Sequence, residues 1–251
     1  MPKVFIGITT SIILLILVFV FTQPSSPPSS TEGTSTNENS SEITTPQKDY
    51  PVIVLDAGHG GFDPGKVGVN GELEKDINLS IVKKLQVLLE EEGFTIYLTR
   101  DSDKLLGPAN STSKKKDDMI ARINMISEIK PFFTISIHQN SFTSPNTSGP
   151  QVFYYKDSEA SATMAQILQD IMNEYLQPAK NRVAQSNTNY YLLTRTPTPT
   201  VIVECGFLSN PTEAGLLSSE EYQNKVANAI FLGILSYFKT SLQFRHQSTD
   251  A

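Results

Sequence analysis

Val52-Ile53-Val54-Leu55-Asp56-Ala57-Gly58-His59-Gly60-Gly61 is the stretch of sequence that decides the fold. The aliphatic run at 52–55 is typical of a strand that is buried on both faces of a sheet. The glycines after it indicate a sharp loop, and apolar residues at helical spacing from Leu79 to Leu89 then predict a helix. A strand that leads into a helix is the repeating unit of an α/β fold.

The same alternation continues along the chain. Further strands are predicted at residues 95–98, 132–137, 152–155, 190–193 and 201–203, and further helices at 117–129, 158–175 and 221–238, with a short helix that begins at Asn210-Pro211. Strands that alternate with helices favour a parallel sheet covered on both faces. We therefore expect one α/β domain over residues 50–240, with a twisted, mostly parallel sheet of about six strands and helices on both faces.

Two segments of different composition precede this domain. Residues 4–22 carry no charge and match the roughly 20 residues that a helix needs to span a bilayer. Because no small-residue cleavage site follows closely, we predict that residues 1–22 are a membrane anchor rather than a cleaved signal. Lys3 then places the rest of the chain outside the cytoplasm, membrane-anchored or secreted. Residues 23–49 are rich in Pro, Ser and Thr and are expected to be a disordered linker.

Composition excludes several classes of protein. The chain has 251 residues, with 20 basic and 26 acidic side chains and a formal net charge of −6, which argues against a nucleic-acid-binding function. Its single cysteine, Cys205, can form neither an intramolecular disulfide nor a cysteine-based zinc finger. With no histidine predicted beside it, Cys205 is expected to be a core residue rather than a nucleophile. The polar end of the chain, residues 241–251, is predicted to be a flexible tail.

Histidines stand at the ends of two predicted strands. His59 follows strand 52–55, and His138 directly follows strand 132–137. Sites in open α/β sheets gather at such strand ends, so the two imidazoles could share one metal ion if their strands are neighbours. A catalytic zinc ion takes three protein ligands and leaves a fourth position open for water. A single histidine at a strand end is more often structural, and it is the pair that favours a site.

Carboxylates near these strand ends could complete the site. Glu74, at the start of the first helix, is a candidate for the third zinc ligand, with Glu72 and Asp76 as alternatives. Glu204 directly follows the apolar strand 201–203, where a carboxylate is costly unless a metal ion, water or donor meets it. Beside a zinc-bound water such a carboxylate can act as a general base in amide hydrolysis.

The glycine-rich loop also comes within one residue of a phosphate-binding P-loop. Residues 60–67 read GGFDPGKV, and the last position should carry a hydroxyl group for magnesium, whereas Val67 has none. No helix is predicted to begin there either, because the segment Gly68-Val69-Asn70-Gly71 follows. A nucleotide site is therefore not expected.

Five motifs stand in order along the chain: DAGHGG at 56–61, EKDINL at 74–79, LTR at 98–100, SIHQN at 136–140 and VECGFLSNP at 203–211. Together they resemble the zinc-dependent N-acetylmuramoyl-L-alanine amidases of bacterial cell walls, over nearly the whole span from Pro51 to Phe238. The family has an α/β fold with a twisted, mostly parallel sheet, so the resemblance implies the same fold for this chain.

The resemblance also implies the site and the reaction. It assigns His59, Glu74 and His138 as ligands of one Zn²⁺ ion and Glu204 as the catalytic carboxylate. The implied substrate is peptidoglycan, in which the family hydrolyses the amide between the lactyl group of N-acetylmuramic acid and L-alanine. Zinc would polarise the carbonyl, Glu204 would activate water, and the alanine amine would leave protonated. An activating protein partner is not identified by the sequence.

This chain departs from the family pattern at two positions. Ala57 stands where proline is common, and Gln139 stands where a small residue usually follows the histidine. Neither change removes a ligand, but Gln139 is expected to narrow the approach to zinc. The predicted organisation, with one membrane segment, a compact single domain and no wall-binding repeats, is most similar to that of the sporulation-associated branch. Members of that branch prepare muramic δ-lactam in the spore cortex. A general autolysin or daughter-cell separation enzyme, a non-catalytic peptidoglycan-binding module and a zinc peptidase acting within the stem peptide are the alternatives.

Overall fold

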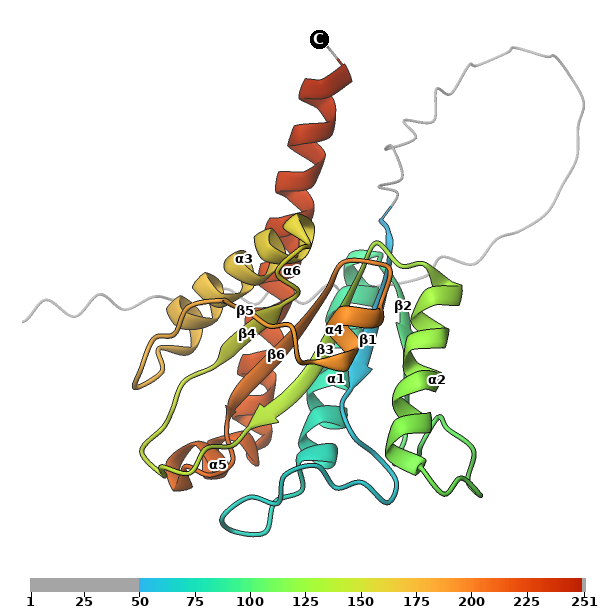
Figure 1. Ribbon diagram of the computed structural model, residues 1–251. Helices are drawn as coiled ribbons and strands as arrows, with labels where there is room; N and C mark the ends of the chain where they lie inside the picture. The colour runs from blue at the N-terminus through green and yellow to red at the C-terminus, as the bar shows by residue number, and fades with distance from the viewer. Residues whose placement is uncertain (1–49, 250–251) are drawn as a thin grey trace, which may run out of the picture. The chain divides into compact units, whose positions relative to one another are not determined.

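The computed structural model describes residues 50–249, which contain one six-stranded sheet in the order β2-β1-β3-β6-β4-β5 (Figure 1). The strands are β1 (Val52–Ala57), β2 (Thr95–Leu98), β3 (Phe133–Asn140), β4 (Gln151–Tyr154), β5 (Gln185–Ser186) and β6 (Thr200–Phe207). The helices are α1 (Glu74–Glu92), α2 (Lys114–Ile129), α3 (Glu159–Leu176), α4 (Tyr191–Arg195), α5 (Pro211–Leu217) and α6 (Glu220–Thr249). The predicted anchor at residues 1–22 and the predicted linker at 23–49 lie outside the described residues.

The sheet is mostly parallel, as predicted. β1 pairs in parallel with both β2 and β3, β3 pairs in parallel with β6, and only β4 runs antiparallel to its neighbour β6. Because β1, β3 and β6 are parallel neighbours, their carboxyl ends meet at one edge of the sheet. This edge is where the histidines at the strand ends were expected to meet.

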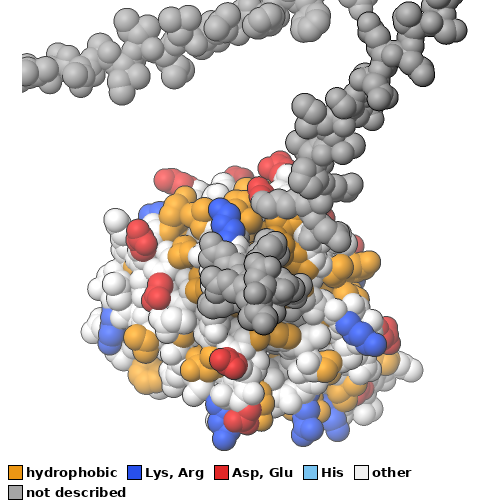
Figure 2. Space-filling model, turned by 90° about the horizontal axis from the view of Figure 1, so that it is seen from above, with side chains coloured by type: hydrophobic (Ala, Val, Ile, Leu, Met, Phe, Trp, Pro, Cys, Tyr) orange, Lys and Arg blue, Asp and Glu red, His pale blue; other side chains and the backbone are white. Residues whose placement is uncertain are grey.

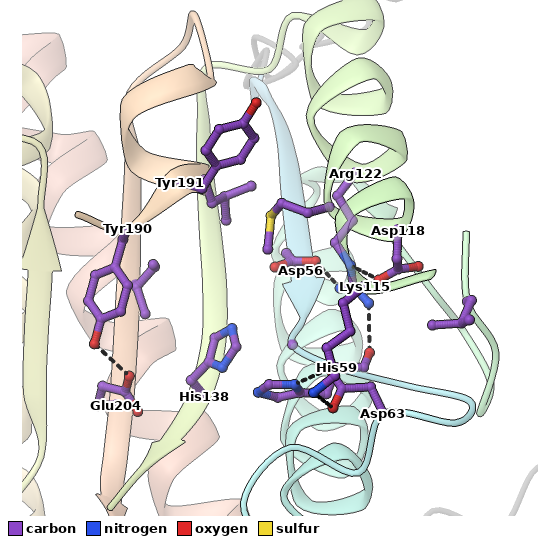
Figure 3. Close-up of a pocket in the computed structure, with 15 residues that line it drawn as sticks. Asp56, His59, Asp63, Lys115, Asp118, Arg122, His138, Tyr190, Tyr191 and Glu204 are labelled. Atoms are coloured by element: carbon purple, nitrogen blue, oxygen red, sulfur yellow. Dashed lines mark hydrogen bonds and ion pairs between the residues drawn. The ribbon is translucent and has the colours of Figure 1, made fainter. Parts of the chain in front are cut away.

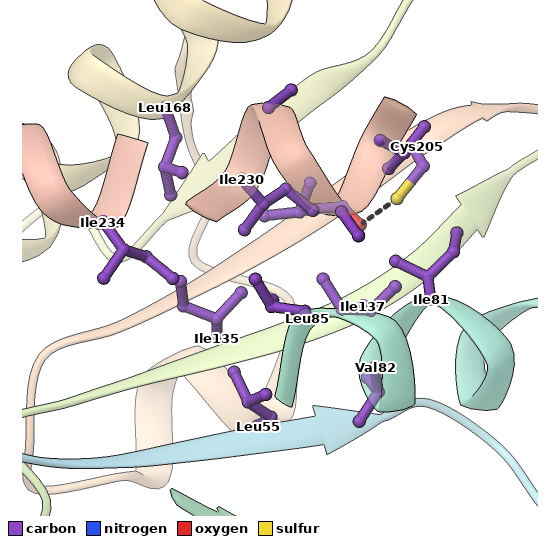
Figure 4. Close-up of a cluster of buried hydrophobic side chains, with 14 of the residues drawn as sticks. Leu55, Ile81, Val82, Leu85, Ile135, Ile137, Leu168, Cys205, Ile230 and Ile234 are labelled. Carbon is purple, nitrogen blue, oxygen red and sulfur yellow. Dashed lines mark hydrogen bonds between the residues drawn. The ribbon is translucent and has the colours of Figure 1, made fainter. Parts of the chain in front are cut away.

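Helices cover both faces of the sheet, which confirms a second prediction. The main core lies between the sheet and helices α1, α3 and α6 (Figure 4), and a smaller cluster lies between the opposite face and helices α2 and α4. Strand periodicity explains the division, because Ile53 and Leu55 of β1 belong to the main core whereas Val54 belongs to the smaller cluster. Cys205 is buried in the main core, as expected for a residue without a nucleophilic role.

The predicted strand at 190–193 is wrong, because this segment begins helix α4. Leu192 and Leu193 are both buried in the smaller cluster with Ile202. Two consecutive residues that pack on the same neighbours fit a helix, whereas a strand would turn them to opposite faces. The sixth strand is instead the short β5, whose two residues, Gln185 and Ser186, are both exposed and carry no apolar pattern.

The last helix is longer than predicted. α6 continues to Thr249, whereas the sequence predicted its end near Phe238, and the intervening residues contain no glycine or proline to stop it. The predicted boundary between domain and tail at residue 240 therefore falls within a helix. Between residues 50 and 249, no helix has both the length and the apolar character needed to cross a membrane. On the face seen in Figure 2, acidic and basic side chains are interspersed with hydrophobic ones.

Candidate active site

A cavity of about 270 Å³ lies over the sheet between helices α2 and α4. Its floor is formed by residues of β1, β3 and β6, and its walls include Met119 of α2 and Leu192 of α4. His59, His138 and Glu204 all line it (Figure 3). The cavity therefore combines apolar walls with a few polar groups at the strand ends, which is the usual composition of a small-molecule site.

Three side chains at this edge could hold a metal ion. Ligand atoms of His59, Glu74 and His138 all lie within 4.8 Å of one another. His59 Nε2 is 3.2 Å and His138 Nδ1 is 2.9 Å from the same oxygen, Oε1 of Glu74. Two imidazole nitrogens and one carboxylate oxygen are a donor set that suits zinc.

The structure also separates Glu74 from the two alternatives that the sequence left open. Glu74 is buried, with 3% of its surface exposed, and its Oε2 accepts a hydrogen bond from the backbone N–H of Lys66 at 2.7 Å. Glu72 instead accepts hydrogen bonds from Asn70, and Asp76 is exposed. Neither belongs to the group that surrounds the two histidines.

The absence of a side chain at two glycines provides the space that these ligands occupy. A Cβ atom on Gly58 would lie 2.2 Å from Cε1 of His138. A Cβ atom on Gly65, where φ is +69°, would lie 2.5 Å from Oε2 of Glu74 and 2.6 Å from Cδ2 of His59. Any side chain at either position would displace a ligand, so the glycines of this loop serve the site as well as the turn.

Asp63 orients the His59 ring, a role that sequence reasoning missed. Its Oδ2 lies 2.9 Å from Nδ1 of His59, which leaves Nε2 facing Glu74. The other oxygen, Oδ1, forms an ion pair with Lys115 of α2 at 2.7 Å. A carboxylate on the far nitrogen of a metal-binding histidine fixes its tautomer and its orientation. Asp63 lies in an irregular loop, so no periodic pattern could have identified it.

Gln139 does not narrow the approach to the cavity, contrary to expectation. Strand alternation turns it away from His138, and it is buried with only 3% of its surface exposed. Its Nε2 donates to Oδ1 of Asn78 on α1, whose own Nδ2 donates to the Gly58 carbonyl. The backbone N–H of Gln139 donates to Oε1 of Glu74. Gln139 thus forms hydrogen bonds with Glu74 and Asn78, and its side chain does not line the cavity.

Glu204 has one carboxylate oxygen engaged and one free of protein partners. Oε1 accepts a hydrogen bond from the Tyr190 hydroxyl at 3.5 Å, while Oε2 is buried and has no hydrogen-bond partner among the described residues. A buried polar atom without a partner is costly unless water or a ligand meets it. Tyr190 was not predicted as a functional residue because its segment was assigned to a strand.

Burial and neighbouring charges shift the pKa values of the ionisable side chains in the site. Burial raises the pKa of Glu204 to about 7, although the neighbouring His138 opposes this shift. Burial lowers the pKa of His138, but the hydrogen bond and the charge of Glu74 outweigh burial and raise it to about 9. Burial raises the pKa of Glu74, but hydrogen bonds from both histidines bring it well below its ordinary value. Glu74 is therefore ionised, as a metal ligand must be.

Comparisons with known proteins agree with this geometry. A family model described as N-acetylmuramoyl-L-alanine amidase matches residues 53–236. The germination-specific N-acetylmuramoyl-L-alanine amidase of Bacillus subtilis is 38% identical over 190 residues, which cover 74% of this chain and 79% of that protein.

Solved structures show the same similarity. The CwlD amidase of Clostridioides difficile, solved in complex with the GerS lipoprotein, is 38% identical, with a TM-score of 0.73 over 76% of this chain and 99% of that chain. The amidase AmiC2 of Nostoc punctiforme is 31% identical, with a TM-score of 0.66 over 75% of this chain and 97% of that chain. This chain therefore belongs to the N-acetylmuramoyl-L-alanine amidase family, whose members are amide hydrolases of the bacterial cell wall.

Proposed function

We propose that the chain uses one zinc ion, held by His59, Glu74 and His138, to hydrolyse the amide between N-acetylmuramic acid and L-alanine in peptidoglycan. The observation that carries this proposal is the position of Glu204, a carboxylate that lines the same cavity as the two histidines. The donor set fits zinc, because it combines two nitrogens and an ionised carboxylate within 4.8 Å. The family membership supports the same reaction.

Each protein group then has a role in the reaction. When bound, zinc would supply the positive charge that polarises the scissile carbonyl and lowers the pKa of water. The carboxylate of Glu204 accepts a proton of the attacking water and later delivers it to the alanine nitrogen as the amide bond breaks. A buried carboxyl group with a pKa near 7 is suited to both steps, because it can gain and lose a proton near neutral pH.

The setting of the reaction follows from the chain outside the cavity. We propose that residues 4–22 anchor the protein in the membrane and that the catalytic domain works outside the cytoplasm. Similarity to a germination-specific amidase favours a role on spore peptidoglycan over a role as a vegetative autolysin. Because the C. difficile relative was solved with a lipoprotein, we propose a membrane-bound lipoprotein as the class of protein partner.

The test is to incubate the purified full-length chain with peptidoglycan, with and without a chelator, and to assay newly freed amino-terminal alanine. Activity that the chelator removes and zinc restores is the expected result. New amino termini from other stem-peptide residues would indicate a peptidase, and binding without release would indicate a non-catalytic module. Glu204→Gln should keep zinc and lose turnover, whereas His59→Ala should lose both. Turnover equal to that of the wild type in either variant would contradict the proposed roles.

A further inference from the structure

His59 occupies a backbone conformation that is unfavourable for its residue type. Its φ angle is 62°, in the left-handed region. Two other residues of the described chain share this feature without being glycine, Lys130 and Gln177, and both end helices, where the left-handed conformation is common. His59 ends no helix, so contacts around it must hold it in place.

Two buried arginines provide these contacts. Arg122 donates from Nη1 to the Ala57 carbonyl at 2.8 Å and from Nη2 to the His59 carbonyl at 2.6 Å. Arg100 donates from Nε to the Ala57 carbonyl at 2.9 Å and from Nη2 to the Gly58 carbonyl at 3.0 Å. Three consecutive carbonyl groups of the loop are thus bonded to guanidinium groups.

Arg100 also joins the loop to helix α1. The same Nη2 atom donates to the Lys75 carbonyl at 2.7 Å, one residue after Glu74. Arg100 has 1% of its surface exposed, and within residues 50–249 no carboxylate lies at ion-pair distance from it. Its hydrogen bonds all go to backbone carbonyls, so this buried cation is matched by the dipoles of the segments that carry His59 and Glu74.

Arg122 connects the loop to the strand that carries His138. It forms buried ion pairs with Asp118 at 2.8 Å and with Asp56 at 2.5 Å. The other oxygen of Asp56 accepts a hydrogen bond from Ser136 at 2.6 Å, two residues before His138. Both arginines are almost fully buried, with 2% or less of each exposed, although Arg122 is part of the cavity lining.

We propose that Arg100 and Arg122 are positioning residues that form the metal site before a metal ion binds. They hold the left-handed His59 loop against α1 and β3, so the three ligands stand close together in the metal-free chain. This inference rests on the proposed zinc site. Lysine at either position would keep the positive charge, but its single ammonium group lacks the fixed fork that reaches several carbonyls at once.

The test compares zinc dissociation constants of the full-length wild type, Arg100→Lys and Arg122→Lys by competition with a chelator of known affinity. Arg182→Lys is the matched control, since Arg182 also donates to a backbone carbonyl, that of Ser148, but contacts no proposed ligand. We expect zinc binding roughly 10–100-fold weaker in the two loop variants and unchanged in the control. Saturating zinc should restore kcat without a change in KM.

Unchanged zinc affinity in folded loop variants would overturn the inference while the zinc site itself stands. A wild type that binds no zinc would instead overturn the proposed function. If both loop variants fail to fold, amide hydrogen exchange in the zinc-free wild type tests whether the loop is already ordered without the metal ion. The N–H groups of Gly60 and Asp63 are bonded within the loop, so they should be protected without zinc. Free exchange that becomes protected only when zinc is added would overturn the inference.

Discussion

His138 and Glu204 lie directly opposite each other on the parallel strands β3 and β6, and both face the same cavity. Backbone hydrogen bonds between the two strands therefore fix the position of the proposed metal ligand relative to the proposed general base. A register shift of one residue would turn Glu204 into the opposite face of the sheet, where Cys205 and Val203 are buried in the main core. The register of β6 against β3 is therefore part of the active site.

Gly58→Ala should abolish zinc binding without unfolding the domain. The new Cβ atom would lie 2.2 Å from Cε1 of His138, so the ring must leave its position. Zinc content after dialysis against a zinc-containing buffer measures the effect. Gly215→Ala is the control, because a Cβ atom on Gly215 would have no neighbouring atom within 4 Å, and this variant should bind zinc normally. A Gly58→Ala chain that retains wild-type zinc content would refute the steric argument.

Asp63→Ala should weaken zinc binding by roughly 10–100-fold, because His59 loses the carboxylate that fixes its tautomer and ring orientation. The zinc dissociation constant measures this loss. The control is Asp101→Ala, which removes an exposed ion pair with Lys104 and should leave zinc affinity unchanged. Equal affinities in the two variants would mean that Asp63 does not orient His59.

Much of the fold could be predicted because long apolar runs leave little choice. Strands β1, β3 and β6 are buried along most of their length, and their aliphatic runs predicted them directly. The segment at 190–193 was misassigned because a short apolar run fits a strand and a buried helical turn equally well. Strand β5 could not be found, because its pairing with β4 depends on a neighbour distant in sequence.

The candidate site was predictable to a similar degree. Strand ends pointed to His59, His138 and Glu204, which the structure brings to one cavity, whereas Glu74 was separated from its neighbours only by resemblance to a family. Asp63 was beyond reach, because its role depends on how an irregular loop folds back on His59. Such contacts arise from tertiary structure and leave no periodic pattern in the sequence.

Acid should destabilise the protein through Asp56. Burial raises the pKa of Asp56, but Arg122 and hydrogen bonds from Ser136 and Thr99 outweigh burial and lower it from 3.8 to about 2. A lowered pKa stabilises the fold above the unfolded value, so about 2 kcal/mol is present above roughly pH 4 and is lost as the pH falls towards 2. Urea unfolding across this range measures the free energy of unfolding.

Ser136→Ala provides the comparison for this prediction. Removing the Ser136 hydroxyl takes away one hydrogen bond that stabilises ionised Asp56, so the pKa of Asp56 should rise towards its ordinary value. The variant should therefore lose less stability between roughly pH 4 and pH 2 than the wild type does. Identical pH profiles for the two chains would show that Asp56 does not control acid stability.

Tyr190→Phe should lower kcat by roughly fivefold, which corresponds to about 1 kcal/mol, and leave KM and zinc affinity unchanged. Burial raises the pKa of Tyr190 to about 12, so its hydroxyl stays protonated and can donate to Oε1 of Glu204. That bond orients the carboxylate, and phenylalanine would keep the edge contact with Phe153 while losing the donor. Tyr191→Phe is the control, since the Tyr191 hydroxyl points away from Glu204 (Figure 3). If both variants have the wild-type kcat, Tyr190 has no part in orienting the general base.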